Sequence, residues 1–581
     1  MKRIFTLLCL YLTFGNNGSA QSINFHSQFD SSFTAEGNYL LVGRMAGNYL
    51  FIYSDFKTQT KLVVCDQYGT PLKERGYDFI NDESTVAVNL IPNKESWSLI
   101  VQTVNGNMHY TQTVKLNAEG EILQDLVKID SARYDKLKSA AIYNMTSSRN
   151  GNYFLLYRIL RGYSTGQILL NYILLDKDAN PLGSKSFYIP FDEVFEVLNN
   201  IFLAPDGTVY LALHDKALNY RLGSKLRLYK SDLKSDQPIQ TEIYLKENKP
   251  LELAFDSDPE NSFVAIGALY ANFYSKDVDG VVAAIFNPAT NRLDTVVYMA
   301  MDKGFKKELK KGISGIKVED LVNQMHLKYF RVNPDKTISI VTDLLSSRDY
   351  YNVTQTSSST NYQTSQVGVN GNLMPSQSFD EMRNYIAATT LPTAPDGRRS
   401  SSRSPPTGTT GGSNNVFAQQ RPTNMGEWNN QMSRLQGNGI TSPNWRNAYD
   451  SYFQSTYTSA IRKNTMVMKS IVFSIDKNHK PVWKTWVWNL YIPETPFTTV
   501  THLPINNQVS LINYELTPKN DVFLQQQSFS MVGKVIAQPI GKPQQPLLFH
   551  GGNMLRLGDK EVLTLYFDPV RNKVGLANIN W

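Results

Sequence analysis

Few residue patterns in this sequence could do chemistry. The clearest is Gly162-Tyr163-Ser164-Thr165-Gly166, a literal G-x-S-x-G in which the serine of a hydrolase would be the nucleophile. That motif needs a strand before the serine and a helix after it. Here β-rich runs lie on both sides, at Tyr153–Leu160 and Gln167–Leu175. The pattern therefore predicts a hairpin tip and not a hydrolase site.

Residues that commonly hold metals also lack the required spacing. Asp176, Asp178 and Asn180 resemble the start of a calcium loop, but Pro181 stands where that loop needs glycine. No glutamate closes the loop at its twelfth position. The histidines form no H-x-H or H-x-x-x-H pair; they are His26, His109, His214, His326, His479, His502 and His550. No metal or cofactor site is predicted, and an enzyme would need carboxylates from different repeats to meet in space.

Charge and cysteine content narrow the function classes. A formal charge of +7 over 581 residues is too mild and too dispersed for a dedicated nucleic-acid binder. One of the two cysteines, Cys9, lies in the N-terminal apolar run, so no disulfide within the mature chain is expected. The other, Cys65, follows the apolar residues Leu62–Val64 and is predicted to be a small buried core residue.

Residues 1–20 have the features of a secretory signal peptide. Lys2 and Arg3 precede the apolar run Ile4–Phe14, and small residues at Gly18–Ala20 favour cleavage before Gln21. We therefore expect an exported protein that is periplasmic or associated with the outer membrane, with an extracellular location as the alternative. No later stretch approaches 18 uninterrupted apolar residues, so no transmembrane helix is predicted, and peripheral membrane association stays open.

The unit that organises the chain is a hairpin at Ile201–Asp215. Pro205 presets the backbone early in its turn, and Gly207 supplies a left-handed residue late in the turn. Relatives of this unit recur with turns near these residues: Gly37, Lys94, Gly151, Glu260, Lys336, Asn507 and Asp559. A spacing of roughly 50 to 57 residues is the period of a propeller or a similar repeat array.

A second hairpin lies between successive copies of the first. Its first strand ends in Asp or Asn, whose side chain can bond the backbone two residues on. The turns begin at Asp66, Asn117, Asp176, Asn287 and Asp476. Two hairpins make four strands, which is one propeller blade. The sequence predicts an all-β propeller of eight blades, with Ser22–Gln28 completing the last blade; seven blades, or two stacked smaller β domains, are the alternatives.

One interruption of the repeat lies between Asp302 and Tyr329. It carries four lysines, which form a candidate basic patch for an acidic partner or for lipid headgroups: Lys306, Lys307, Lys310 and Lys311. The segment Ile316–Leu327 is predicted to be a short amphipathic helix. The alternative is that the lysines belong to an ordinary solvated helix end.

The larger interruption, residues 346–465, falls in the sixth unit and divides the propeller into residues 21–345 and 466–581. It is rich in Ser, Thr, Asn and Gln, and we expect it to be largely disordered. Short helix candidates place aromatic and apolar residues at helical spacing: Trp428, Met432, Leu435, Trp445, Tyr449 and Phe453. These are candidate partner-binding residues; alternatively, the helices pack back on the propeller.

The hairpin Ala204–Asp215 (APDGTVYLALHD) resembles those of secreted bacterial β-propellers with WD40-like or kelch-like repeats, a broad class and no specific family. That resemblance implies a fold and no activity. We favour a non-catalytic binding or scaffold protein of the bacterial cell envelope, whose loops and insertion engage a protein such as an outer-membrane or secretion component. The alternatives are a propeller enzyme acting on glycans or peptides, and an extracellular carbohydrate binder or adhesin.

Overall fold

The computed structural model describes residues 22–345 and 467–580 apart from short stretches, the longest of which are 55–59, 134–142, 216–224, 273–277, 312–324, 492–496, 517–521 and 542–547. The predicted signal peptide (1–20) and the predicted insertion (346–465) lie outside the described residues.

The described strands form eight antiparallel sheets, numbered here in chain order. Sheet 1 holds β2 (Asn38–Met45), β3 (Asn48–Ser54), β4 (Lys61–Cys65) and β5 (Pro71–Gly76). Sheet 2 holds β6 (Thr85–Pro92), β7 (Trp97–Asn105), β8 (Met108–Leu116) and β9 (Ile122–Arg133). Sheet 3 holds β10 (Asn144–Ser147), β11 (Tyr153–Arg161), β12 (Gln167–Asp176) and β13 (Pro181–Pro190). Sheet 4 holds β14 (Glu196–Leu203), β15 (Val209–Asp215), β16 (Lys225–Ser231) and β17 (Ile239–Tyr244).

Sheet 5 holds β18 (Asn248–Ser257), β19 (Val264–Asn272), β20 (Val278–Asn287) and β21 (Arg292–Ala300). Sheet 6 holds β22 (Met325–Val332), β23 (Ile338–Leu345), β24 (Val467–Ile475) and β25 (Pro481–Tyr491). Sheet 7 holds β27 (Thr501–Ile505), β28 (Gln508–Leu516), β29 (Val522–Phe529) and β30 (Val535–Gly541). Sheet 8 holds β26 (Phe497–Thr498), β31 (Leu548–Gly558), β32 (Glu561–Asp568), β33 (Lys573–Asn580) and β1 (Ser22–Gln28). The helices among the described residues are α2 (Asp78–Asn81) and α3 (Lys303–Lys310).

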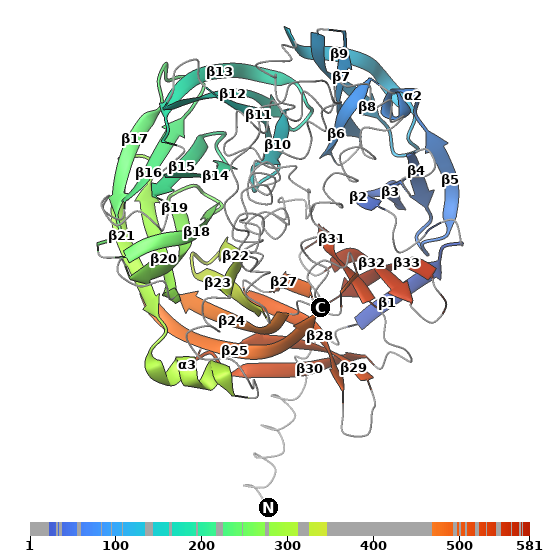
Figure 1. Cartoon of the computed structure of the whole chain (residues 1–581). Helices are drawn as coiled ribbons and strands as arrows, with labels where there is room; N and C mark the ends of the chain where they lie inside the picture. Colours follow the sequence, from blue (N-terminus) through green and yellow to red (C-terminus); the bar gives the residue numbers. More distant parts are fainter. Residues whose placement is uncertain are drawn as a thin grey trace, which may run out of the picture.

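The sheets are arranged in a ring, with the early strand of each sheet near the centre and the late strand at the rim (Figure 1). This arrangement confirms the predicted all-β propeller fold. Sheet 6 is interrupted between β23 and β24, which confirms that the long insertion falls in the sixth unit.

The ring is closed by the N-terminal strand, as predicted. β1 pairs antiparallel with β33, so that Ile23 lies opposite Ile579 and Phe25 opposite Ala577. The Tyr566 hydroxyl donates to the carbonyl oxygen of His26 at 2.9 Å. The first and last described segments of the chain therefore belong to one sheet.

Strand direction gives the ring two distinct ends. Consecutive strands within a sheet are antiparallel, so the connections after the second and fourth strands share one end. That end includes Leu345 and Val467, where the chain leaves β23 and returns at β24; we call it the insertion face. The turns after the first and third strands lie at the opposite end, which we call the hairpin face.

The predicted turn chemistry is present on the hairpin face. Gly207 has φ +85°, and its N–H donates to the carbonyl oxygen of Ala204 at 3.0 Å. In the second type of hairpin, Asp66 Oδ1 accepts backbone N–H bonds from Tyr68 and Thr70, each at 2.8 Å. Matching pairs of bonds are made by the side chains of Asn117, Asp176 and Asp476. Because the Asp176 carboxylate caps its own turn, this structure accounts for the residues that resembled a calcium loop.

The core consists of apolar layers between neighbouring sheets. Between sheets 5 and 6, the Phe330 ring lies over Gly267, where an added Cβ would come within 2.2 Å of the ring. Cys65 is fully buried in the layer between sheets 1 and 8, and burial raises the pKa of its thiol to about 12. The prediction of a buried structural cysteine is therefore confirmed.

The predicted helix Ile316–Leu327 is wrong at its C-terminal end. Met325, His326 and Leu327 are buried in strand β22, which pairs with β23. Strand pairing and burial at the centre of the ring outweigh the helical spacing of the apolar residues. Residues 312–324 lie outside the described part of the chain. The described helix of this region is α3, which begins after Asp302.

Candidate functional site

The sequence patterns considered above form three sets, and the structure describes them to different extents. The six anchors of the insertion lie outside the described residues: Trp428, Met432, Leu435, Trp445, Tyr449 and Phe453. Residues 162–165 of the G-x-S-x-G sequence lie outside the described residues; the strands on either side, β11 and β12, pair along their length, so a strand and not a helix follows the motif. The four lysines lie on or next to α3, at the insertion face.

The lysines of α3 are partly neutralised. Lys306 pairs with Asp279 at 3.1 Å, and Lys311 pairs with Glu308 at 2.7 Å. Within the described residues, no ion pair to Lys307 or Lys310 is found. The helix therefore exposes a basic surface that is weaker than four free lysines would make it.

Lys469 anchors this helix to the strand that follows the insertion. Its ammonium group is buried at the start of β24 and donates to the carbonyl oxygens of Leu309 (2.7 Å) and Lys311 (2.8 Å). It also lies 3.6 Å from the centroid of the Trp486 ring. A cation at a helix C-terminus satisfies the last carbonyl groups and interacts favourably with the helix dipole.

Replacing Lys469 with methionine is expected to loosen α3, because the helix then loses both donors at its C-terminus. Two hydrogen bonds from a charged group should correspond to at least about a 10-fold loss of amide protection. Hydrogen–deuterium exchange of residues 303–311 measures this loss. Lys336→Met on the hairpin face, which breaks an ion pair with Glu260, is the control and should leave α3 unchanged.

The Lys469→Met variant should also change how the free energy of unfolding depends on pH. Burial lowers the pKa of Lys469 to about 8 from 10.5, so the unfolded chain binds more protons than the folded chain between those values. The unfolding free energy of the wild type, minus that of Lys469→Met, should therefore rise as pH increases from about 8 to 10.5. A flat difference over this window would contradict the lowered pKa of the buried Lys469.

A carboxylate pair lies at the insertion-face end of sheet 4. Glu196 opens β14 and Asp215 ends β15, and the two residues are direct partners in the antiparallel register. Glu196 is held by Arg227 and by the backbone N–H of Asp192, the latter at 2.8 Å. Both carboxylates are buried. This pair comes from adjacent strands of one sheet, and not from different repeats.

The two carboxylates have different environments. Burial and the nearby charge of Glu196 raise the pKa of Asp215, and among the described residues Asp215 Oδ2 has no hydrogen-bond partner. Glu196, in contrast, has a guanidinium and a backbone donor. Different environments give the two members of a carboxylate pair different pKa values, so that one can act as an acid and the other as a base. The Glu196–Asp215 pair is therefore the strongest arrangement for catalysis in the described structure.

A second group of buried charges lies near the inner strands of sheets 5 and 6. His326 Nδ1 lies 3.1 Å from Glu252 Oε1, and burial lowers the pKa of His326 to about 4. Lys328 pairs with Asp343 at 3.1 Å, and Asp343 accepts a hydrogen bond from Ser470 at 2.6 Å. These groups satisfy one another. No cluster of three or more metal-ligating side chains is found among the residues that the structure describes.

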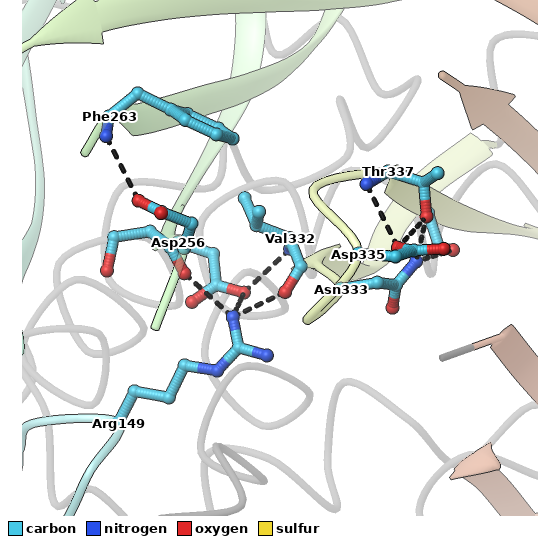
Figure 2. Close-up of polar contacts among 10 residues, drawn as sticks. Arg149, Asp256, Phe263, Val332, Asn333, Asp335 and Thr337 are labelled. Atoms are coloured by element: carbon cyan, nitrogen blue, oxygen red, sulfur yellow. Dashed lines mark hydrogen bonds and ion pairs between the residues drawn. The ribbon is translucent and has the colours of Figure 1, made fainter. Parts of the chain in front are cut away.

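On the hairpin face, Arg149 links three sheets across the ring (Figure 2). It follows β10 of sheet 3, and its Nη1 donates to Asp256 Oδ2 at 3.2 Å and to the carbonyl oxygen of Ser257 at 2.7 Å. The same nitrogen donates to the carbonyl oxygen of Val332 in sheet 6. Asp256 also accepts the Val332 N–H at 2.8 Å. Since the charged groups of Arg149 and Asp256 are bonded to each other and to backbone groups, the arrangement is structural.

Comparison with known proteins finds no matching family model and no matching curated protein. Among solved structures, the Dos1 propeller aligns over 97% of this chain and 96% of its own, with 5% identity and a TM-score of 0.39. The WD40 domain of SCAP from fission yeast aligns over 97% and 99%, with 7% identity and a TM-score of 0.31. A PL25 polysaccharide lyase, an ulvan lyase, aligns over 86% and 95%, with 8% identity and a TM-score of 0.33. These TM-scores are below 0.5, so the β-propeller fold rests on the sheet topology of this chain.

Proposed function

We propose that this protein is a non-catalytic binding scaffold of the bacterial cell envelope, exported by its N-terminal signal sequence. It engages a protein partner through the loops of the insertion face and through residues 346–465. No helix within the described residues is long and apolar enough to cross a membrane. The partner surface that fits α3 is acidic, because Lys303, Lys307 and Lys311 are exposed on it.

The observation that carries this proposal is the position of the insertion. The chain leaves β23 at Leu345 and returns at Val467, at the same end of the ring as α3. Lys469, two residues after the return, bonds α3 directly. The two points where the insertion joins the ring and the basic helix thereby lie at one edge of the ring, and binding residues concentrate on loops that a rigid scaffold positions.

The test is crosslinking of the tagged, full-length protein in the cells that make it, followed by purification. Replacing residues 355–440 with a short Gly/Ser linker should lower the yield of crosslinked partner at least 10-fold. Tyr68→Ser is the matched control, since Tyr68 is 64% exposed on the hairpin face, and it should leave the yield unchanged. Full retention of every partner by the shortened chain would refute docking through the insertion.

A second candidate, a propeller enzyme acting on glycans, is favoured by the Glu196–Asp215 pair alone. It predicts release of reducing sugars from a glycan by the wild type. That release should fall at least 100-fold in Asp215→Asn, while the crosslinked partner is retained. The absence of any sugar release by the wild type would leave the scaffold function.

A further inference from the structure

Six buried polar atoms that have no hydrogen-bond partner among the described residues lie between sheets 2 and 3. They belong to four side chains of the described structure: His109 (both ring nitrogens), Thr111 and Thr113 (both hydroxyls), and Arg158 (Nε and Nη1). The first three alternate along β8 and share the face directed toward sheet 3. Arg158, on β11, lies on the same side as Phe154 and Leu156, which pack against sheet 2.

The residues around these four side chains are, in contrast, fully bonded. Tyr143 exchanges two hydrogen bonds with the Gln102 side chain, each at 2.7 Å, and its hydroxyl donates to Asp130 Oδ2 at 2.8 Å. Its ring lies 4.6 Å from Arg158 Cζ and 6.4 Å from the His109 ring. Tyr143, Gln102 and Asp130 therefore form a hydrogen-bonded frame. The four side chains that this frame surrounds keep unused donors and acceptors.

Leaving such groups unpaired is costly. A buried donor or acceptor that loses its water without gaining a partner costs about 1–3 kcal/mol, and a charged group costs more. Arg158 is 8% exposed and His109 is 1% exposed, so bulk water does not satisfy them. Buried polar groups of natural proteins are nearly always bonded to protein, water or a ligand. Four such side chains in one place indicate a bound species.

The charge of the lining identifies the class of that species. Arg158 is a permanent cation, and the one carboxylate in the frame, Asp130, is already bonded by Tyr143. Burial beside Arg158 lowers the pKa of His109 to about 4, so the imidazole is neutral and offers one N–H donor. Guanidinium, imidazole and hydroxyl donors together suit the oxygen atoms of an anion.

We propose that Arg158, His109, Thr111 and Thr113 form a binding site for an oxyanion group, a carboxylate or a phosphate, between sheets 2 and 3. The end of the site that holds Arg158 and His109 lies nearer the insertion face, because Arg158 is near the end of β11 and His109 is near the start of β8. It goes beyond the proposed scaffold function and does not depend on it.

The test uses the full-length protein at fixed ionic strength, with sodium chloride exchanged for acetate, phosphate or sulfate. The melting temperature of the wild type should rise saturably with one of these anions. Arg158→Met should raise the apparent Kd at least 10-fold, whereas Arg75→Met, which breaks an exposed pair with Glu121, should leave it unchanged. A response to acetate alone assigns the site to carboxylates, and a response to phosphate and sulfate assigns it to tetrahedral oxyanions.

A second variant and an NMR measurement test the proposal if Arg158→Met does not fold. Thr111→Val removes one hydroxyl from a fully buried side chain and should weaken the anion response several-fold without unfolding the protein. The His109 imidazole NMR signals, identified by their loss in His109→Phe, should shift on addition of the same anion. The proposal is overturned if none of the three anions gives a saturable response, or if Arg158→Met and Thr111→Val both respond like the wild type.

Discussion

Replacing Arg149 with methionine is expected to lower the free energy of unfolding by about 3–5 kcal/mol, because the change leaves a buried carboxylate without its cation. The side chains of Arg149 and Asp256 are only 6% and 8% exposed, and their charged atoms lie 3.2 Å apart. The carbonyl groups of Ser257 and Val332 lose their donor as well. Urea unfolding followed by tryptophan fluorescence measures the loss.

A double variant separates the effect of the unpaired Asp256 charge from the effect of the lost Arg149 contacts. In Arg149→Met with Asp256→Asn the uncompensated charge is absent, while the amide oxygen can still accept the Val332 N–H. We expect this pair to recover at least half of the lost stability. Lys73→Met, which breaks an exposed pair with Glu121 at 3.8 Å, is the control and should cost less than about 1 kcal/mol. An equally small loss in Arg149→Met would show that Arg149 does not hold sheets 3, 5 and 6 together.

Arg149 also shows why this site could not be predicted from sequence. The turn around it was recognisable as a relative of the one at Gly207, because turn residues act locally. Its partners Asp256 and Val332, however, are 107 and 183 residues away in the chain. The repeat period indicates that these turns lie on one face of a ring. It does not indicate which side chain crosses the ring to which carboxylate.

The carboxylate pair was missed for a related reason. Glu196 and Asp215 are brought opposite each other by the register of β14 and β15, and that register shifts at a bulge between Leu198 and Ile201. A one-residue error in register would place one of them on the other face. Lys469 left a clearer signal, since it is the one charged residue of the largely apolar strand β24. A charge in such a run indicates a buried partner, here the end of α3.

Sequence patterns predicted the strands correctly where the repeats were regular. They gave the wrong element where pairing with a distant strand of the ring decides the structure. The strand β1 was predicted because the last blade lacked a fourth strand and Ser22–Gln28 was unassigned, and the structure places it there. The segment ending in Leu327 had helical spacing, but the inner position of sheet 6 required a strand. Strand pairing between distant segments, and not local propensity, decides these cases.

Removing β1, residues 22–28, is expected to open the ring and cost about 5 kcal/mol. The deletion removes the backbone hydrogen bonds to β33 and the contacts of Phe25 and His26 with Tyr566. It also leaves β33 as an exposed edge, which pairs readily with other chains. The shortened protein should elute as oligomers in size-exclusion chromatography and unfold at lower urea concentration than the wild type.

A covalent bond across the same pair of strands should have the opposite effect. Phe25 and Ala577 are direct partners in the register, so cysteines at both positions lie within reach of a disulfide. The bond would close a loop of about 550 residues and stabilise the protein by roughly 2–4 kcal/mol, an effect that a reducing agent should abolish. Cys65 is fully buried and does not compete for the new thiols.

If the chain without β1 stays monomeric with unchanged stability, and the disulfide adds nothing, closure of the ring by the N-terminal strand does not stabilise the fold. If both effects appear, β1 is the element that completes the propeller, and folding of the ring must wait until both β1 and β33 are available.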